Sequence, residues 1–355
     1  MRAGWTGPLL LAGSIVAVAF CHPAPCQAWD WRDAPVDLRI GLAFDRQAST
    51  FTDVVGLSAS GAYPYGSSVN PASDDLVRTP PNDFTLAGTA TLFYIPFARG
   101  ASVTAEAASV SGRLPGAGTV TATYSRTESH DARSAQGDSY QLESHDVIIG
   151  YSHLVLPWLA LGGEFKITDS VLKFGSSVLG FPLDTTTESV GYDARAGVVF
   201  APQKNWLIGL MVGAGWSYAR TDGAVLIPDA FGGPVAVDFD TFTRSVNIRA
   251  GAGWRPSEQF GTYVDLQYLR LWTDEDSVTV GRGFAGIEYL PIEALALRVG
   301  GSIDTAGKTN VSAGIGFYGL KHALFEVAYV YNAFPELRRE FGGAHLLSAS
   351  IVLYY

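Results

Sequence analysis

Charge is scarce in this sequence. Asp, Glu, Lys and Arg make up only 16% of its 355 residues, whereas about 25% is usual for soluble domains. The sequence also has no run of Lys or Arg, and its net charge is -10, so nothing indicates a nucleic-acid partner. Hydrophobic residues reach 47%, and glycine (40 residues) and aromatics (12%) are plentiful. This composition is typical of a membrane β-barrel, where glycines relieve crowding and aromatics line the interfaces.

Cysteine is almost absent. The only two, Cys21 and Cys26, lie in an N-terminal segment with the features of a secretory signal peptide. These features are Arg2, the uncharged stretch 9–20 and the small-residue site that ends at Ala28. We expect residues 1–28 to be removed. The mature chain would then have no cysteine, which excludes disulfides and thiolate chemistry.

A lipoprotein is the alternative interpretation of this N-terminus. Lipid attachment at Cys21 or Cys26 needs a small residue before the cysteine, but Phe20 and Pro25 stand there.

Long apolar runs are missing as well. The uncharged stretch 9–20 is far shorter than the ~20 residues of a spanning helix, and no later segment is long and apolar enough. An exported protein of this kind is expected in the outer membrane of a Gram-negative cell, surrounded by outer-membrane lipid.

The last twelve residues, AHLLSASIVLYY, indicate that strands and not helices would cross the membrane. Leu347, Ala349, Ile351 and Leu353 fall on one face when every second residue is taken. This period of two predicts an extended strand with two different environments. In an outer-membrane barrel the last strand pairs with the first, so that no backbone group is left unpaired in lipid. Tyr355 would lie in the aromatic girdle at the periplasmic interface.

The same alternation predicts an antiparallel transmembrane β-barrel of about fourteen strands over residues 84–355. The predicted strands are 84–97, 101–112, 119–128, 141–153, 158–168, 190–200, 206–219, 242–254, 260–272, 278–290, 295–304, 310–319, 323–332 and 344–355. Short connections alternate with longer ones such as 169–189, 220–240 and 333–343. Short periplasmic turns and long external loops are typical of bacterial barrels. The N-terminal strands leave an alternative open. The turn 98–100 looks periplasmic, although counting strands back from the C-terminus places it outside. Merging 101–128 into one strand and counting 36–44 as the first again gives fourteen.

The two faces of the predicted strands can be separated. The outward sets are Val190, Tyr192, Ala194, Ala196, Val198 and Phe200; Val246, Ile248, Ala250, Ala252 and Trp254; and Phe325, Val327, Tyr329 and Tyr331. Nine charged residues fall in the opposite phase and are expected to face the lumen: Glu164, Lys166, Asp193, Arg195, Arg249, Asp265, Glu288, Arg298 and Glu326. Their signs are mixed. Mixed signs favour ion pairs that brace the wall over a selective polar filter, which would present one dominant sign.

Residues 29–83 form the least regular region. They contain one strand-like run, 36–44, and then a stretch rich in Gly, Ser and Pro that cannot span the membrane. We expect this region to be a plug inside the lumen or a long loop. Two later loops are apolar for exposed segments. They supply candidates for a ligand groove, or would pack on each other as a lid: Phe174, Leu179, Phe181, Val225, Leu226, Ile227 and Phe231.

Three stretches resemble the long-chain fatty-acid transporter (FadL) type of outer-membrane protein and its PorV-like relatives. The first is GAYPYGSSVNPASDD at 61–75, with Asn70, Pro71 and Ala72 matching the family's Asn-Pro-Ala motif and Ser73 replacing the usual Gly. The others are LALGGEFKITDS at 159–170 and the pair LALRVGGSIDTAGKTNVSAGIGF and FEVAYVYNAFPEL at 295–337. The resemblance implies a fourteen-stranded barrel with an N-terminal hatch, which passes hydrophobic molecules through a groove and a deeper apolar pocket. It also implies a lateral opening in the wall.

The function expected from this resemblance is outer-membrane transport of fatty acids or aromatic hydrocarbons. The alternatives are a PorV-like partner of a secretion system that does not transport, and a general porin. An enzyme is not expected: Ser144, His145 and Asp146 are adjacent on a strand and point to opposite faces. No histidine pair has metal-ligand spacing, and no cofactor is expected. The expected partners are membrane lipid, the barrel-assembly machinery during insertion and a hydrophobic ligand.

Overall fold

The computed structural model describes residues 27–30, 70–75, 86–114, 116–178, 181–203, 205–226 and 233–355. Most of the predicted signal peptide and of the predicted plug region lies outside these residues. Strand β1 (Gln27–Asp30) spans the predicted cleavage point before Trp29. It pairs in parallel with Asp276–Thr279 of β12. This edge of β12 is free for it because the pairing between β12 and β13 stops at Arg282 and Asp304.

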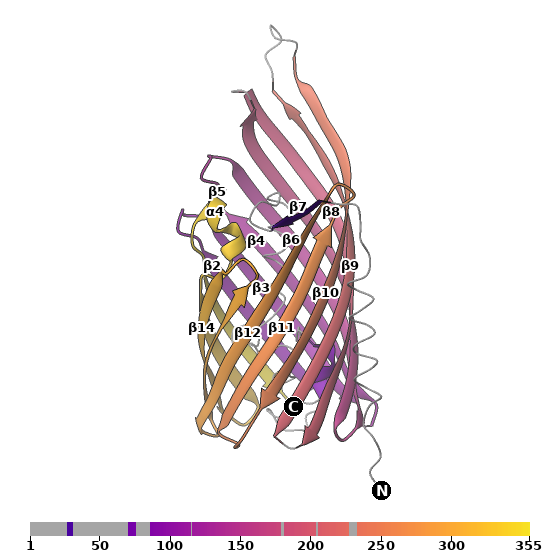
Figure 1. The fold of residues 1–355 in the computed structure, drawn as a ribbon, viewed down its shortest axis with the longest axis vertical. Helices are drawn as coiled ribbons and strands as arrows, with labels where there is room; N and C mark the ends of the chain where they lie inside the picture. Colours follow the sequence, from indigo (N-terminus) through magenta and orange to yellow (C-terminus); the bar gives the residue numbers. More distant parts are fainter. Residues whose placement is uncertain are drawn as a thin grey trace.

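Fourteen antiparallel strands close into a barrel (Figure 1). They are β2 (Leu86–Pro96), β3 (Ser102–Leu114), β4 (Gly118–His130), β6 (Ser139–Leu156), β7 (Leu159–Val178), β8 (Phe181–Gln203), β9 (Trp206–Val225), β10 (Val235–Trp254), β11 (Phe260–Trp272), β12 (Asp276–Ile292), β13 (Leu295–Asp304), β14 (Thr309–Leu320), β15 (Ala323–Tyr331) and β16 (His345–Tyr354). The short β5 (Ala132–Arg133) pairs with β6. Closure is made by β16, which pairs with β2 from Leu347–Tyr94 to Tyr354–Ala87. The predicted barrel, its strand number and its closing strand are confirmed.

The two ends of the barrel differ. The C-terminus and the short turns lie at one end, here called the turn end, while β7 to β10 project beyond the other strands at the opposite, loop end (Figure 1). The turn Ala98–Gly100 lies at the loop end, where Ala98 donates to the Gly343 carbonyl over 2.9 Å. The turn therefore lies at the end opposite the C-terminus, as the parity of the predicted strands requires. The alternative of one strand over 101–128 is wrong, because a turn near Gly116 separates β3 from β4.

The two longest predicted loops are largely strand. β7 continues to Val178 and β8 begins at Phe181, where a loop over 169–189 was predicted. Likewise β9 reaches Val225 and β10 begins at Val235, inside the predicted loop 220–240. Beyond the membrane neither face meets lipid, so the apolar alternation ends there. The backbone ladder nevertheless continues, because each strand still has a neighbour with which to pair.

The alternation of the strands separates an inner from an outer face. Lipid-facing side chains such as Leu266 (65% exposed) and Ile149 (59%) stand uncovered by protein, whereas Arg298 and Glu288 on the inner face are buried. Within the described residues, no helix has the length and apolarity needed to cross a membrane. The outward sets predicted from the sequence lie on the outer face.

The connection between β15 and β16, residues 332–344, folds into the mouth of the barrel at the loop end. We call it the cap segment. It contains the short helices η3 (Pro335–Leu337) and α4 (Arg338–Phe341), and α4 lies over this mouth in Figure 1. Phe334, Leu337 and Phe341 are buried in an apolar cluster with inward residues of β2, β3, β15 and β16. This cluster contains the largest number of buried side chains among the described apolar clusters.

Candidate transport lumen

The Asn-Pro-Ala motif lies inside the barrel near the turn end. Asn70 precedes the short helix η1 (Pro71–Asp75), and Asn70, Pro71 and Ala72 are all buried. The helix rests on the inner faces of β6, β7 and β8. Two glycines of the wall make room for it. A Cβ at Gly162 would overlap the Pro71 backbone, and a Cβ at Gly197 would overlap the Asn70 side-chain oxygen.

Asn70 ties the motif to the wall through its side chain. Its Nδ2 donates to the carbonyl oxygens of Val198 and Leu210 over 3.2 and 3.3 Å, and these two residues face each other across β8 and β9. The Asn70 Oδ1 accepts from the backbone N–H of Ala72 over 3.1 Å, which fixes the turn into η1. One amide therefore both shapes the motif and attaches it to two strands.

Charged side chains of the inner wall form two groups of ion pairs. In the first, Arg195 contacts Glu164 over 3.2 Å and Asp193 over 2.8 Å, on β7 and β8. Lys166 lies 4.0 Å from Asp146 of β6. This group lines the wall above η1 toward the loop end.

The second group joins β12, β13 and β15 near the turn end. Arg298 contacts Glu288 over 2.6 Å and Glu326 over 3.1 Å, and all three side chains are at most 6% exposed. Arg255 also contacts Glu288. Of the other two predicted lumen charges, Arg249 lies with its guanidinium carbon 4.2 Å from the ring centre of Phe284. Asp265 is fully buried on the inner face of β11.

Replacing Arg298 tests whether the second group braces the wall. Arg298→Met would leave the buried Glu288 and Glu326 carboxylates without their shared guanidinium, while Arg255 would still serve Glu288. We expect a loss of about 1–3 kcal/mol in the free energy of unfolding, measured as a lower urea midpoint of the purified barrel in detergent. Arg220→Met, which breaks an exposed pair with Asp222, should leave the midpoint unchanged. An unchanged midpoint for Arg298→Met would argue against bracing.

The inner face of β2, β3, β4 and β16 carries hydroxyls. Thr91 and Ser350 are 2.9 Å apart, and Ser111 and Thr121 are also 2.9 Å apart. The Thr123 hydroxyl is buried and has no hydrogen-bond partner. The resemblance implied a deep apolar pocket, and this part of the described wall is instead lined with Ser and Thr.

The implied lateral opening can also be compared with the wall. The ladders from β2 through β3 and β4 to β6 run without a register shift. Register shifts occur in four other strand pairs, each at the turn end, for example between Phe317 and Leu320. The described strands of this region therefore form a continuous wall.

Five aromatic rings meet under the cap segment. Phe341 lies 5.6 Å from Phe97 and 5.4 Å from Tyr140, measured between ring centres. Tyr140 in turn lies 5.0 Å from Phe174 of β7, and Phe97 lies 6.3 Å from Phe334. We call these residues the mouth cluster. Edge-on and tilted pairs at such distances contribute about 0.5–1.5 kcal/mol each beyond the area they bury.

Polar contacts hold the cap segment to the wall. Glu336 and Arg282 of β12 form an ion pair over 2.8 Å, and both side chains are completely buried. On the other side, Arg99 donates to the carbonyl oxygens of Arg339 and Glu340 over 3.0 and 2.8 Å. The cap is thus attached across the mouth, from β12 to the turn between β2 and β3.

The predicted ligand-groove residues divide into two places. Phe174 belongs to the mouth cluster, whereas Phe181, Val225 and Leu226 lie at the tip of the β8–β9 projection, where Leu226 donates to the Pro182 carbonyl. Leu179, Ile227 and Phe231 lie outside the described residues. The sequence pattern predicts only a long connection at 333–343, where the structure has the cap segment with η3 and α4. Its signal was the helical spacing of Phe334, Leu337 and Phe341 within that loop.

No protein-family model matches the sequence, and no curated protein matches it. Solved structures do resemble the fold. The Ralstonia pickettii toluene transporter TbuX has a TM-score of 0.60 at 12% identity, with 86% of this chain and 96% of that chain covered. The CymD monoaromatic hydrocarbon channel has a TM-score of 0.62 at 12% identity over 86% and 99%. A Pseudomonas aeruginosa FadL homologue has a TM-score of 0.59 at 10% identity over 84% and 97%.

These structures are transporters or channels by their descriptions. At 10–12% identity they establish the architecture, and the similarity to PorV-like relatives stays a prediction. Each alignment covers nearly the whole of the solved chain, with TM-scores of 0.59 to 0.62. The chain therefore has the fold of the FadL-type outer-membrane transporters.

Proposed function

We propose that this protein carries hydrophobic small molecules, such as aromatic hydrocarbons or fatty acids, across the outer membrane of a Gram-negative cell. The loop end faces outward and the turn end faces the periplasm. The observation that carries the proposal is the mouth cluster: five aromatic rings lie together at the loop end of a barrel with a FadL-type fold. A polar solute gains nothing from such a surface, whereas an apolar one does.

The energetics fit a reversible first binding step. A ligand that takes the place of one ring exchanges aromatic contacts for similar contacts, so that opening the cluster costs little net free energy. Burial of the ligand then contributes about 0.8 kcal/mol per methylene group or its equivalent. After association costs this favours weak binding, which suits a molecule that must be released again. The tip residues Val225, Leu226 and Phe181 would collect ligand outside the mouth.

Uptake by whole cells tests the proposal. Cells that express the protein should accumulate labelled toluene or palmitate faster than cells without it, and should not accumulate labelled glucose faster. Phe341→Asp should reduce the uptake of the apolar probe at least about fivefold. An apolar ligand in the mouth cluster would have to remove water from the new carboxylate, and this costs free energy. Arg338→Asp, on the exposed side of α4, is the matched control and should have no effect.

The same assay separates the alternatives. Faster glucose uptake would indicate a general porin. No uptake of any probe, together with a stably co-purifying polypeptide, would favour a secretion partner of the PorV-like kind.

A further inference from the structure

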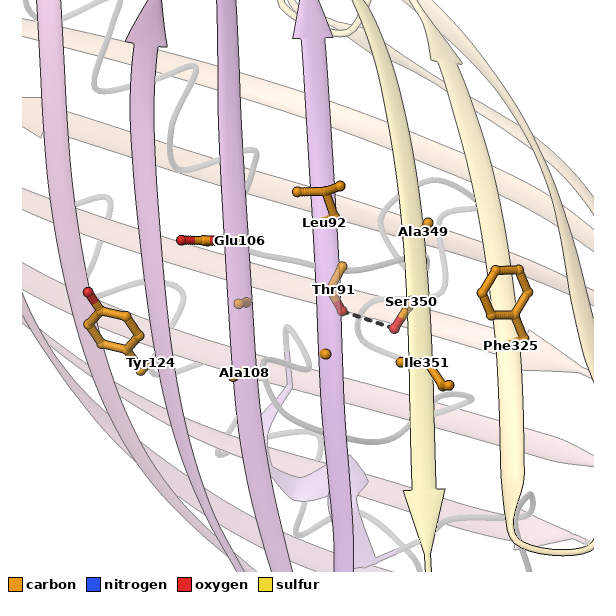
Figure 2. A pocket seen from close by; sticks show the side chains of 11 residues that line it. Thr91, Leu92, Glu106, Ala108, Tyr124, Phe325, Ala349, Ser350 and Ile351 are labelled. Atoms are coloured by element: carbon orange, nitrogen blue, oxygen red, sulfur yellow. Dashed lines mark hydrogen bonds between the residues drawn. The ribbon is translucent and has the colours of Figure 1, made fainter.

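The inner face of β4 carries a hydroxyl at every inward position, and we call this row the hydroxyl ladder. Five of its six side chains are buried and one is half-buried. Alternate residues of a strand are about 7 Å apart, so the ladder is roughly 33 Å long and comparable to the hydrocarbon core of a membrane. On the outer face, Leu92 and Tyr124 instead line a lipid-facing groove (Figure 2). The ladder consists of Thr119, Thr121, Thr123, Ser125, Thr127 and Ser129.

The hydroxyl ladder lies between the mouth cluster and η1. At the loop end, Ser129 accepts a hydrogen bond from the backbone N–H of Leu142 over 2.7 Å, and Leu142 is two residues from Tyr140 of the mouth cluster. At the turn end, Thr119 is the cross-strand neighbour of Ser152, and η1 lies against both β4 and β6. A molecule that passes along this wall from the mouth to η1 therefore meets hydroxyls over the whole distance.

Apolar side chains flank the ladder on both sides. On β3, Ala105 lies opposite Thr127. On β6, Ile148 lies opposite Thr123. The wall thus presents a line of polar atoms between hydrocarbon groups. This arrangement is complementary to a molecule that is mostly apolar and carries one hydrogen-bonding group.

One hydroxyl of the ladder lacks a partner. Thr123 is only 4% exposed, and its hydroxyl makes no hydrogen bond within the described part of the chain. The hydroxyls before and after it on the ladder are engaged: Thr121 lies 2.9 Å from Ser111, and Ser125 donates to Asp146 over 3.2 Å. A buried hydroxyl that has lost water and gained no partner raises the free energy of the protein. A ligand that hydrogen-bonds to Thr123 would remove this penalty.

We propose that the hydroxyl ladder selects neutral apolar molecules that carry a hydroxyl or carbonyl group, such as phenols and alcohols. This inference rests on the proposed transport and specifies its preferred cargo. A Ser or Thr hydroxyl both donates and accepts, so it can bind either group, and the regular spacing lets that group move from one hydroxyl to the next. The ladder itself carries no charge, and Lys166 of the adjoining wall already faces Asp146 over 4.0 Å. An anionic ligand would lose water here without gaining a counter-charge.

Uptake of three compounds that share one ring tests the inference. Toluene has no polar group, p-cresol adds a hydroxyl and p-toluate adds a carboxylate. At pH 7 p-cresol is neutral and p-toluate is anionic. The rate in cells without the protein is subtracted from the rate in cells that express it. We expect this protein-dependent uptake to be roughly fivefold faster for p-cresol than for toluene, as one neutral hydrogen bond allows. Uptake of p-toluate should be slower than that of p-cresol.

Thr123→Val removes the unpaired hydroxyl and nearly keeps the shape of the side chain. It should lower p-cresol uptake to the toluene rate and leave toluene uptake unchanged. Thr123→Ser keeps the hydroxyl and should keep the preference for p-cresol. Thr104→Val, the matched control, removes a hydroxyl from the outer face of β3 and should change neither rate. Heat-modifiable gel migration checks that every variant is a folded barrel.

The outcomes separate this inference from the proposed function. Equal uptake of toluene and p-cresol, faster uptake of p-toluate than of p-cresol, or a p-cresol preference that survives in Thr123→Val would overturn the inference. The proposed function would still stand in these cases if toluene entered faster than in cells without the protein. No protein-dependent uptake of any of the three compounds would overturn both.

Discussion

Adding a methyl group at Gly197 or Gly162 should turn a closed barrel into an ion-conducting one. A Cβ at Gly197 would overlap the Asn70 side chain, and one at Gly162 would overlap the Pro71 backbone. At Gly162 the overlapping atoms are backbone, which cannot move aside locally. At Gly197 they belong to the Asn70 amide, which would have to give up its hydrogen bonds to Val198 and Leu210. In both variants η1 must leave the wall. Conductance of single barrels in planar bilayers would measure the result. Gly197→Ala and Gly162→Ala should give stable open levels where the unmodified protein shows few.

A neighbouring glycine supplies the control for this experiment. The nearest atom to a Cβ at Gly163 is the Arg195 carbonyl oxygen at 3.6 Å, which is ordinary contact distance. Gly163→Ala should therefore leave conductance unchanged. Asn70→Ala removes two hydrogen bonds to the wall, worth about 2 kcal/mol together. That loss should raise the open fraction roughly 30-fold. If Gly197→Ala barrels stayed closed, the motif would not act as the hatch of this lumen.

Breaking the ion pair under the cap segment should have the second large effect. Glu336→Leu would leave the guanidinium of Arg282 buried without its carboxylate. Removing one partner of a buried pair costs about 3–5 kcal/mol. The cap segment is a connection between β15 and β16 and not a strand of the barrel. It can therefore relieve this cost by leaving the mouth while the strands stay paired. We therefore expect local opening of the cap.

Cysteine labelling would detect this opening. The predicted mature chain has no cysteine, so Leu337→Cys introduces a single buried thiol into the cap segment. Its reaction with a maleimide should be slow alone and at least about a hundredfold faster with Glu336→Leu. The double replacement Arg282→Met with Glu336→Leu removes both charges and should restore slow labelling. Equal labelling rates in all three proteins would show that the ion pair does not hold the cap.

The candidate site was only partly predictable from the sequence. The phase of the charges placed Glu164, Arg195 and Arg298 on one face, but their partners depend on which strands are neighbours and in which register. The motif at Asn70 was visible, whereas its attachment to Val198 and Leu210 is not, since these residues are 128 and 140 positions away. Phe97, Tyr140, Phe174 and Phe341 belong to four separate segments, so their meeting at the mouth has no local signal.

The sequence by itself determined the class of the protein, the number of strands and which face of each strand meets lipid. These follow from a period of two, because the backbone geometry of a strand sends successive side chains to opposite sides. Only the tertiary structure decided that the strands β7 to β10 continue beyond the membrane, that residues 332–344 fold into the mouth and that the hydroxyls of β4 lie between the mouth cluster and η1. Such features depend on strand register and barrel closure, which bring together residues that are far apart in the chain.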